Sequence, residues 1–189
     1  DKCNNTVSLS FEYVGDGQID ILKSKIEKVL VYLFDDKGQF IEKHEINKNS
    51  LDSYQGIVLS LDQGSYHAVC WGNTFSNTAI IENEKDISGY LLTHPDYMSE
   101  TPIKTNDSLY YATRSFYVGE NNSEEITIPF VSAHIKFEIY IQGLIRQQTT
   151  NTAGITPVIE IGNLLTEYTF DMSLHGDSVS FFPDIIYET

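Results

Sequence analysis

The sequence predicts an all-β fold: a β-sandwich domain followed by the start of a second β-sandwich domain. Apolar residues recur at every second position over much of the chain, and turn-forming residues separate these stretches. One stretch, 29–34, is apolar at every position, which is typical of a central strand that is buried on both faces. Helical patterns are minor. The 189 residues, 41% of them hydrophobic, suffice for one large or two small domains.

The first part of the chain is expected to supply most of one sandwich from antiparallel strands. Five strands are predicted there, at residues 6–14, 27–35, 40–46, 57–61 and 64–73. The turn sequence Asp-Asp-Lys-Gly joins the second to the third strand as a hairpin, and Asp-Gln-Gly predicts another hairpin between the fourth and fifth. The polar stretch 47–55 is expected to form one helical turn, capped by Asn49 or Ser50.

A long connection at 73–107 interrupts the strand pattern. Connections of that length are usually functional or covered by a partner. Two more strands follow, at 109–118 and 125–130. A boundary after them divides the chain into an N-terminal β-sandwich domain, residues 1–130, and the start of a second β-sandwich domain, residues 131–189.

The second region is expected to begin with a strand at 133–141. Its apolar positions alternate strictly, as Ile135, Phe137, Ile139 and Ile141. Further strands are predicted at 158–161, 168–174 and 179–182. Because the region is shorter than the ~100 residues of a typical sandwich, it is expected to be either truncated or completed by a partner.

The chain has two cysteines, Cys3 and Cys70, and no C-x-x-C motif. Each shares its strand parity with apolar residues, so both sulfur atoms can reach one sheet interior. A Cys3–Cys70 disulfide is therefore predicted, which would stabilise the fold by ~4 kcal/mol through closure of a long loop. Two inert buried thiols are the alternative. A disulfide would favour the periplasm, the cell surface or secretion over the cytosol.

The formal net charge of −15 argues against binding to nucleic acid or to anionic lipid through a basic patch. Scattered carboxylates can also collect calcium, but the stretch from Asp16 to Asp20 lacks the spacing of a calcium loop and is better explained as a turn. No run approaches the ~18 apolar residues of a membrane span. The start at Asp1 suggests that an export signal is missing from the sequence.

No motif for catalysis, a metal or a cofactor is present in the sequence. Five histidines are scattered along it, without the H-E-x-x-H, G-x-S-x-G or phosphate-loop patterns. We therefore expect a protein that is not an enzyme and that binds no cofactor. A secreted hydrolase is a third interpretation, which requires a catalytic constellation that the sequence does not show.

Aromatic residues are the remaining candidates for ligand contact. Trp71, Tyr110 and Tyr111 can stack on sugar rings or contact a partner protein. Aromatic residues at strand spacing are more often part of the core, and this alternative stays open.

Short motifs in a fixed order carry a resemblance to a known family. They are Phe11-Glu12-Tyr13 after Cys3, Val31-Tyr32-Leu33-Phe34-Asp35 before Gly38, Gly64 and Tyr66 before Cys70-Trp71-Gly72-Asn73, Asp107-Ser108-Leu109-Tyr110-Tyr111, and Ala133-His134-Ile135-Lys136-Phe137 before Gly143-Leu144. In this order they resemble the fimbrillin-associated anchor proteins of Bacteroidales. The resemblance covers most of the chain.

The resemblance implies two transthyretin-like, Greek-key β-sandwich domains in an exported lipoprotein of the outer membrane. It also implies a position at the base of a fimbria, with fimbrial structural subunits as partners that join through donated strands. Cys3 matches the family's second cysteine, so the lipid-bearing cysteine is expected upstream of this sequence. In related stalk subunits, an arginine-specific protease removes the first strand. No arginine precedes Arg114 here, which fits a first strand that stays in place, although Lys23 and Lys25 leave cleavage by another protease open.

Two functions are therefore predicted. The first is a non-enzymatic cell-surface anchor or accessory subunit that tethers or caps a fimbria. The second is a fimbrial tip adhesin or glycan-binding module on the same scaffold, with a host or glycan receptor as its partner.

Overall fold

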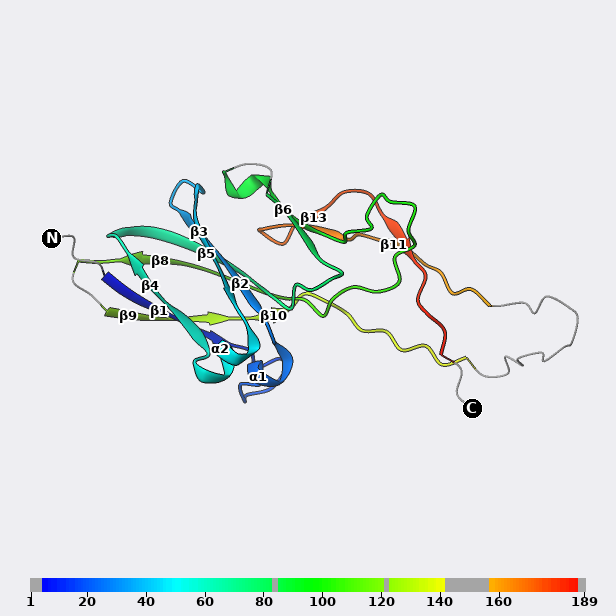
Figure 1. The fold of residues 1–189 in the computed structure, drawn as a ribbon, viewed down its shortest axis with the longest axis horizontal. Coiled ribbons are helices and arrows are strands. Elements are labelled where there is room, and N and C mark those ends of the chain that lie inside the picture. The colour runs from blue at the N-terminus through cyan, green and yellow to red at the C-terminus, as the bar shows by residue number, and fades with distance from the viewer. Residues whose placement is uncertain (1–4, 83–84, 121–122, 142–156, 187–189) are drawn as a thin grey trace, which may run out of the picture.

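The computed structural model describes residues 5–82, 85–120, 123–141 and 157–186 (Figure 1). Two sheets form the sandwich. The first has the order β4-β1-β9, with β4 at Gly56–Leu61, β1 at Asn5–Glu12 and β9 at Ser123–Pro129. The second has the order β10-β8-β5-β2-β3, with β10 at Val131–Ser132, β8 at Tyr110–Val118, β5 at Gly64–Gly72, β2 at Val29–Asp35 and β3 at Phe40–Ile46. The predicted all-β sandwich is confirmed.

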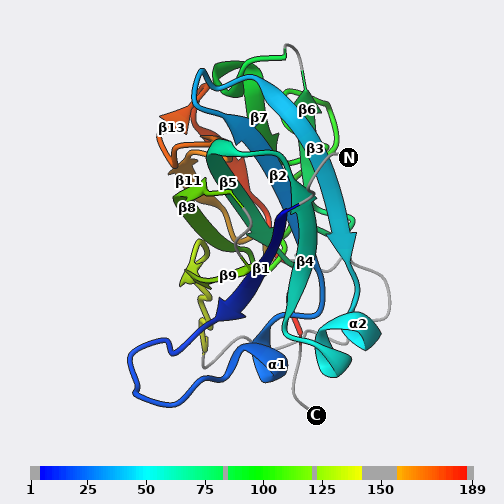
Figure 2. The ribbon, with the colours of Figure 1, turned by 90° about the vertical axis from the view of Figure 1, so that its left-hand side faces the viewer.

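Two smaller sheets complete the described part of the chain. One has the order β13-β12-β7-β6, with β13 at Leu174–His175, β12 at Glu167–Thr169, β7 at Tyr90–Thr93 and β6 at Ala79–Glu82. The other pairs β11, Ile161–Leu164, with β14, Val179–Phe181. The helical turns are α1 at Leu22–Lys25, α2 at Lys48–Ser53 and η1 at Ile87–Gly89. Figures 1 and 2 show α1 and α2 side by side at one end of the sandwich.

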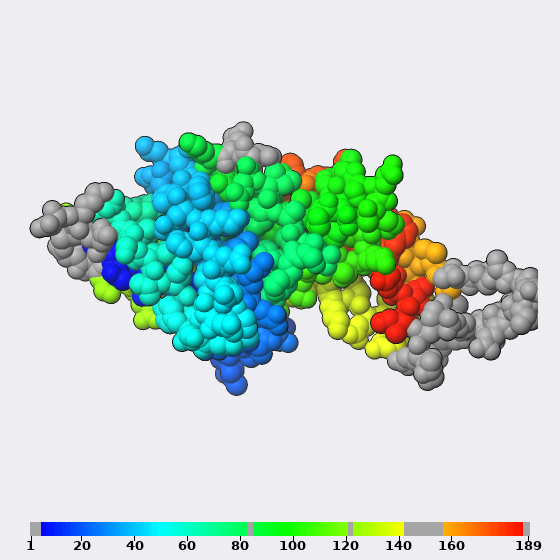
Figure 3. Space-filling view, in the orientation of Figure 1, coloured from blue at the N-terminus to red at the C-terminus, as the bar shows by residue number. Residues whose placement is uncertain are grey.

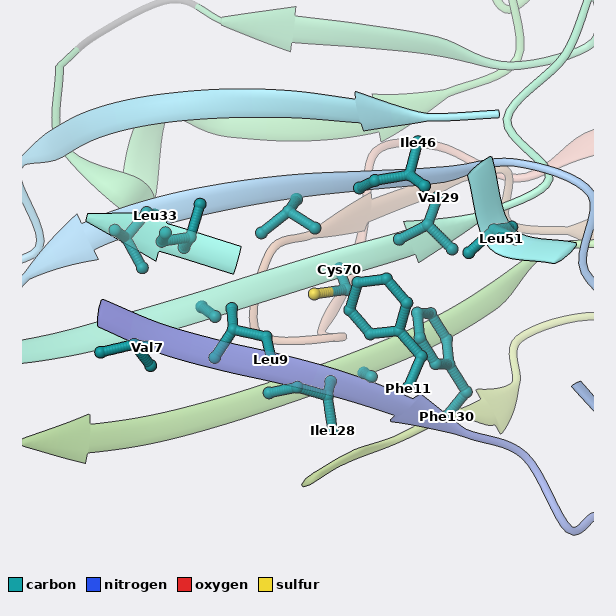
Figure 4. Packing of buried hydrophobic residues seen from close by; sticks show 14 of the residues in the cluster. Val7, Leu9, Phe11, Val29, Leu33, Ile46, Leu51, Cys70, Ile128 and Phe130 are labelled. Atoms are coloured by element: carbon teal, nitrogen blue, oxygen red, sulfur yellow. The ribbon is translucent and has the colours of Figure 1, made fainter. Parts of the chain in front are cut away.

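The main core lies between the two large sheets (Figure 4). On β1, Val7, Leu9 and Phe11 are at most 2% exposed, whereas the residues between them are more accessible, as the period of two predicted. Cys70 on β5 points into the same core. Burial of each such large apolar side chain contributes about 1.5–3 kcal/mol to stability.

A second core lies on the other face of β2 and β5, under the four-stranded sheet. Its members are Leu30, Tyr32, Phe34, Val69, Trp71, Tyr90, Leu92, Leu109, Tyr111 and Phe170. The ring of Phe170 packs edge-on against Tyr32, with 5.0 Å between the centroids. Strand β2 is thus buried on both faces, which confirms the prediction drawn from its unbroken apolar run.

The hairpin predicted between residues 57–61 and 64–73 is wrong. β4 pairs with β1, and β5 pairs with β2 and β8, so the chain crosses from one sheet to the other between Leu61 and Gly64. Leu59 on β4 and Cys70 on β5 enter the same core from opposite sides. A turn signal predicts that the chain reverses direction, but not that the two strands pair.

Three further expectations are corrected. β9 pairs with β1 in parallel, not antiparallel. The long connection 73–107 contains β6, η1 and β7. The cap of α2 is Asn47, whose side chain accepts a hydrogen bond from the backbone N–H of Ser50 at 3.0 Å.

The strand predicted at 133–141 does not form among the described residues, where this segment has no ladder partner. The strands predicted at 158–161, 168–174 and 179–182 correspond in part to β11, β12, β13 and β14. Because β12 pairs with β7, contacts cross the predicted boundary at residue 130, and the division into domains stays a prediction.

Candidate functional site

The three aromatic residues predicted for ligand contact lie in the interior. Trp71, Tyr110 and Tyr111 are 0%, 5% and 8% exposed. The indole of Trp71 packs against the ring of Tyr111, with 4.9 Å between the centroids. The hydroxyl of Tyr111 donates to the carbonyl of Phe170 at 2.7 Å. These contacts fit the alternative that the sequence left open, namely that the three residues belong to the core.

Of the two cysteines, only Cys70 lies within the described residues. Its thiol is free and fully buried, and burial raises its pKa, so the unreactive thiol form is favoured. Figure 4 shows its sulfur between Leu9 and Phe11 along β1. A disulfide requires the two Cα atoms to lie within about 7 Å of each other. The bridge to Cys3 stays a prediction, which peptide mapping without reductant would test.

A corner after β5 joins several segments through one side chain. Asn73 has a positive φ of 61°, a region that asparagine tolerates better than most residues. Its Oδ1 accepts from the backbone N–H of Glu27 at 2.8 Å. Its Nδ2 donates to the carbonyls of Lys25 at 2.8 Å and Ser108 at 3.2 Å. The end of the Cys-Trp-Gly-Asn motif is therefore structural, and it fixes the chain just before β8.

The chain after β10 is attached next to this corner, at Leu109. The carbonyl of Leu109 accepts from the backbone N–H of Ala133 at 2.9 Å and from Nδ1 of His134 at 2.8 Å. The ring of His134 also packs edge-on against Tyr110, with 5.2 Å between the centroids. Tyr110 thus packs against His134, the residue at which the following segment leaves the sandwich.

That segment, residues 135–141, is here called the exposed extension. Its apolar side chains Ile135, Phe137, Ile139 and Ile141 are 78%, 64%, 57% and 51% exposed. Among the described residues, no backbone hydrogen bond joins the extension to another segment. Figure 3 shows it (yellow) projecting below the surface of the main body. An alternating apolar row with free N–H and C=O groups is suited to pairing with a strand.

The polar row of the exposed extension is locally neutralised. Lys136 and Glu138 form an ion pair of 2.6 Å, and Glu138 also accepts from the hydroxyl of Tyr140. The hydrogen bond from Lys136 lowers the pKa of Glu138, and the same contact raises the pKa of Lys136. The extension therefore offers an apolar row, and the charges of Lys136 and Glu138 beside this row cancel each other.

A cavity of about 690 Å³ adjoins the start of the exposed extension. His134 and Phe137 line one side, and residues of β7, β11, β12 and β14 line the others. Asp107 braces one wall, because its carboxylate accepts from the backbone N–H of Phe75 at 2.7 Å and from the hydroxyl of Thr78 at 2.6 Å. Such a cavity can accept side chains of a segment that pairs with the extension.

The described ranges contain no group of three or more His, Cys, Asp or Glu side chains placed to hold a metal ion. In the same ranges, no helix combines the length and apolar character that a membrane span requires.

Sequence reasoning missed the residues that position this surface. Asn73, His134 and Phe170 act through contacts between segments far apart in the chain. For Asn73 and His134 a signal existed, since both lie in the motifs that carry the family resemblance. For Phe170 the sequence offers no such signal.

The model of the family described as fimbrillin-A associated anchor proteins Mfa1 and Mfa2 matches residues 1–184. Among curated proteins, a search found no match.

Several solved structures have a similar fold. The fimbrial anchor protein Mfa2 from Porphyromonas gingivalis has 16% identity and a TM-score of 0.61, over 95% of this chain and 66% of that one. A candidate polysaccharide-binding protein from Bacteroides thetaiotaomicron has 15% identity and a TM-score of 0.69, over 94% and 64%. A candidate adhesin from Bacteroides ovatus has 12% identity and a TM-score of 0.70, over 95% and 62%. The chain thus spans less than two thirds of each of these proteins.

Proposed function

The chain belongs to the family of fimbrillin-A associated anchor proteins, and from this membership we propose that it is a non-enzymatic accessory subunit that tethers or caps a fimbria at the cell surface. Its partners would be fimbrial structural subunits. The similar fold of a fimbrial anchor protein supports this proposal. The observation that carries it is the exposed extension, whose apolar row lacks a partner among the described residues.

The proposed contact is strand pairing. A strand from a fimbrial subunit would pair with the backbone of residues 135–141, and the alternating side chains would become buried. Covering a large apolar side chain contributes about 1.5–3 kcal/mol, so Ile135, Phe137 and Ile139 together can supply substantial affinity. The cavity next to Phe137 would receive side chains of the incoming strand.

We further propose that the subunit is a lipoprotein held in the outer membrane, with the lipid on a cysteine upstream of Asp1. This location suits an anchor, because a fimbria fixed at its base needs an attachment that resists pulling. Incorporation of a labelled fatty acid into the full-length protein in its native host would test it.

Deletion of the gene in its native host tests the anchor role. Fimbriae are counted by length, on cells and in the spent medium. Long fimbriae shed into the medium are expected, because a subunit that caps and tethers the base would be missing. Fimbriae of normal number and length on the cells would contradict the proposal.

A variant of the exposed extension tests the contact itself. Phe137→Asp together with Ile139→Asp would put two charges into the pairing surface, and fimbriae should be shed as in the deletion strain. Ile19→Asp is the matched control, since Ile19 is 77% exposed and lies in the loop after β1. Equal retention of fimbriae by the variant and the control would contradict strand pairing at this segment.

A second candidate function is that of a tip adhesin or glycan-binding module. It is favoured by the similarity to proteins described as a candidate polysaccharide-binding protein and a candidate adhesin. In a deletion strain this function predicts fimbriae that remain on cells which no longer adhere.

A further inference from the structure

The four-stranded sheet covers only part of the five-stranded sheet. One end of the five-stranded sheet is not covered by it. Trp71 and Val69 on β5 are buried under the four-stranded sheet. At the other end of β5 and β8, where Gly64 pairs with Val118, Figure 1 shows no strand of that sheet above them. A groove of about 620 Å³ lies there, next to the β2–β3 turn and η1. Its described lining includes Asp36, Ser65, His67, Ile87, Ser115 and Tyr117.

Four of these side chains form an array on one face of the sheet. Ser65 is paired with Tyr117, and His67 with Ser115, in the antiparallel register of β5 and β8. Residues directly opposite in such a register have Cβ atoms about 4.5–5.5 Å apart. The floor of the groove is therefore polar and hydrogen-bonding, with one aromatic ring at its end.

A row of hydrogen bonds fixes the polar part of this floor. The hydroxyl of Thr113 donates to the carbonyl of Ala68 at 3.1 Å, so it must accept from Nε2–H of His67 at 3.0 Å. The other ring nitrogen, Nδ1, then accepts from the hydroxyl of Ser115 at 2.8 Å. Burial lowers the pKa of His67, which keeps the ring in this neutral form. The lone pairs of the Ser115 oxygen remain as acceptors for a ligand.

The aromatic ring is accessible and fixed. Tyr117 is 53% exposed, and its hydroxyl accepts from Nε2 of Gln63 at 2.8 Å. A solvent-accessible aromatic ring beside hydrogen-bonding groups suits a ligand that has an apolar face and a polar rim. Sugar rings have this form.

We propose that this groove binds neutral oligosaccharides. Tyr117 would stack on one sugar ring, and Ser65, Ser115 and the Asp36 carboxylate would bond its hydroxyls. The charge of the groove selects the class of sugar, because its described lining contains Asp35 and Asp36 but no lysine or arginine. Acidic sugars are disfavoured for the same reason. This inference rests on the second function proposed above, not on the anchor role.

Calorimetric titration of the protein with neutral oligosaccharides of glucose, galactose and mannose tests the proposal, with sialyllactose as the acidic comparator. At least one neutral probe should bind with a Kd of about 1 mM or tighter, and more tightly than sialyllactose. Tyr117→Ala should weaken binding by about tenfold or more through loss of the stacking surface. Ser115→Ala should weaken it by roughly threefold to tenfold.

Two controls separate binding from folding. Tyr117→Phe keeps the ring and should retain affinity within about threefold. Tyr54→Ala removes a tyrosine that is 42% exposed on another surface and should leave affinity unchanged. No binding by any neutral probe, or equal binding by Tyr117→Ala and wild type, would overturn the proposal. Because Tyr117→Ala leaves the exposed extension intact, fimbrial attachment in cells reports on the anchor role separately.

Discussion

Strand β5 and the exposed extension are both predicted from the sequence as strands, and they have opposite surroundings. The extension alternates apolar residues with more polar ones, whereas β5 is apolar at every position from Ala68 to Trp71. β5 is paired along both edges, with β2 and β8, and its last residues are fully buried. The extension follows His134 without a ladder partner among the described residues, and its isoleucines are more than half exposed.

The difference teaches that a strand-like sequence pattern specifies a strand only in combination with a neighbouring segment. The backbone of a strand needs hydrogen-bond partners, and its apolar side chains need a surface to cover them. β5 finds both within the chain. The extension has the pattern but not the cover, so in this protein an unmet strand pattern marks the candidate binding surface.

The largest expected effect tests the packed side of this comparison. Trp71→Ala would leave a cavity between Tyr111 and Phe170 and should lower the free energy of unfolding by about 3–5 kcal/mol, measured by chemical denaturation. Trp71→Phe should cost less, because the indole Nε1 has no hydrogen-bond partner among the described residues. A Trp71→Ala protein of unchanged stability would show that the residue is not a core residue.

A smaller effect is expected from the last residue of β5. A Cβ on Gly72 would lie 3.1 Å from Cβ of Tyr110 and 3.2 Å from Cγ2 of Ile26, so Gly72→Ala should destabilise by about 1–3 kcal/mol. Gly64→Ala, in the same strand, is the matched control, because its nearest neighbour would be 3.7 Å away, at Tyr66. Equal thermal stabilities of the two variants would refute close packing at Gly72.

The edge of the packed region should respond to pH. Burial acts to raise the pKa of Glu82, but hydrogen bonds from Lys43 at 2.9 Å and Tyr32 at 2.8 Å hold it below its usual value. The folded state therefore binds fewer protons than the unfolded state at low pH. The stabilisation is complete above the unfolded pKa of about 4.3 and is lost as the pH falls through the folded pKa.

Glu82→Gln measures this contribution. Because the ion pair is partly exposed, the difference in unfolding free energy from wild type should be only about 0.2–1 kcal/mol at neutral pH. This difference should shrink as the pH falls below about 4, because the Glu82 carboxylate becomes protonated there. Denaturation series of the two proteins, run in parallel at several pH values, measure it. A difference that stays constant through this range would rule out the ionised Glu82 as its source.

The smallest effect belongs to the exposed extension. Ile135→Asp should change the free energy of unfolding by less than about 0.5 kcal/mol, since a largely exposed side chain loses little packing. Ile128→Asp is the contrasting variant, because Ile128 is 0% exposed on β9. Strong destabilisation by Ile135→Asp would show that the extension packs against the chain itself.

Much of the fold was predictable because it depends on local patterns. The period of two placed β1, β3 and β8 within a few residues, and the unbroken apolar run marked β2 as buried on both faces. The pairing of strands was less predictable. The Asp-Gln-Gly turn occurs both in hairpins and in crossings between sheets, so β4 and β5 were wrongly paired.

The candidate site was predictable only in part. Trp71, Tyr110 and Tyr111 were singled out as candidates for ligand contact, but the burial of Trp71 and Tyr111 depends on Phe170, far along the chain. The groove at Tyr117 was not predicted, because whether a sheet face is open or covered depends on where β6 and β7 lie.

The sequence by itself determined which segments can become strands, since side-chain alternation and turn chemistry are local properties of the chain. It also determined the family, through short motifs in a fixed order. Only the tertiary structure decided which strands pair, which aromatic rings are buried and which apolar row is left uncovered. The physical reason is that pairing and burial are properties of two segments at once, and no single segment of sequence specifies its partner.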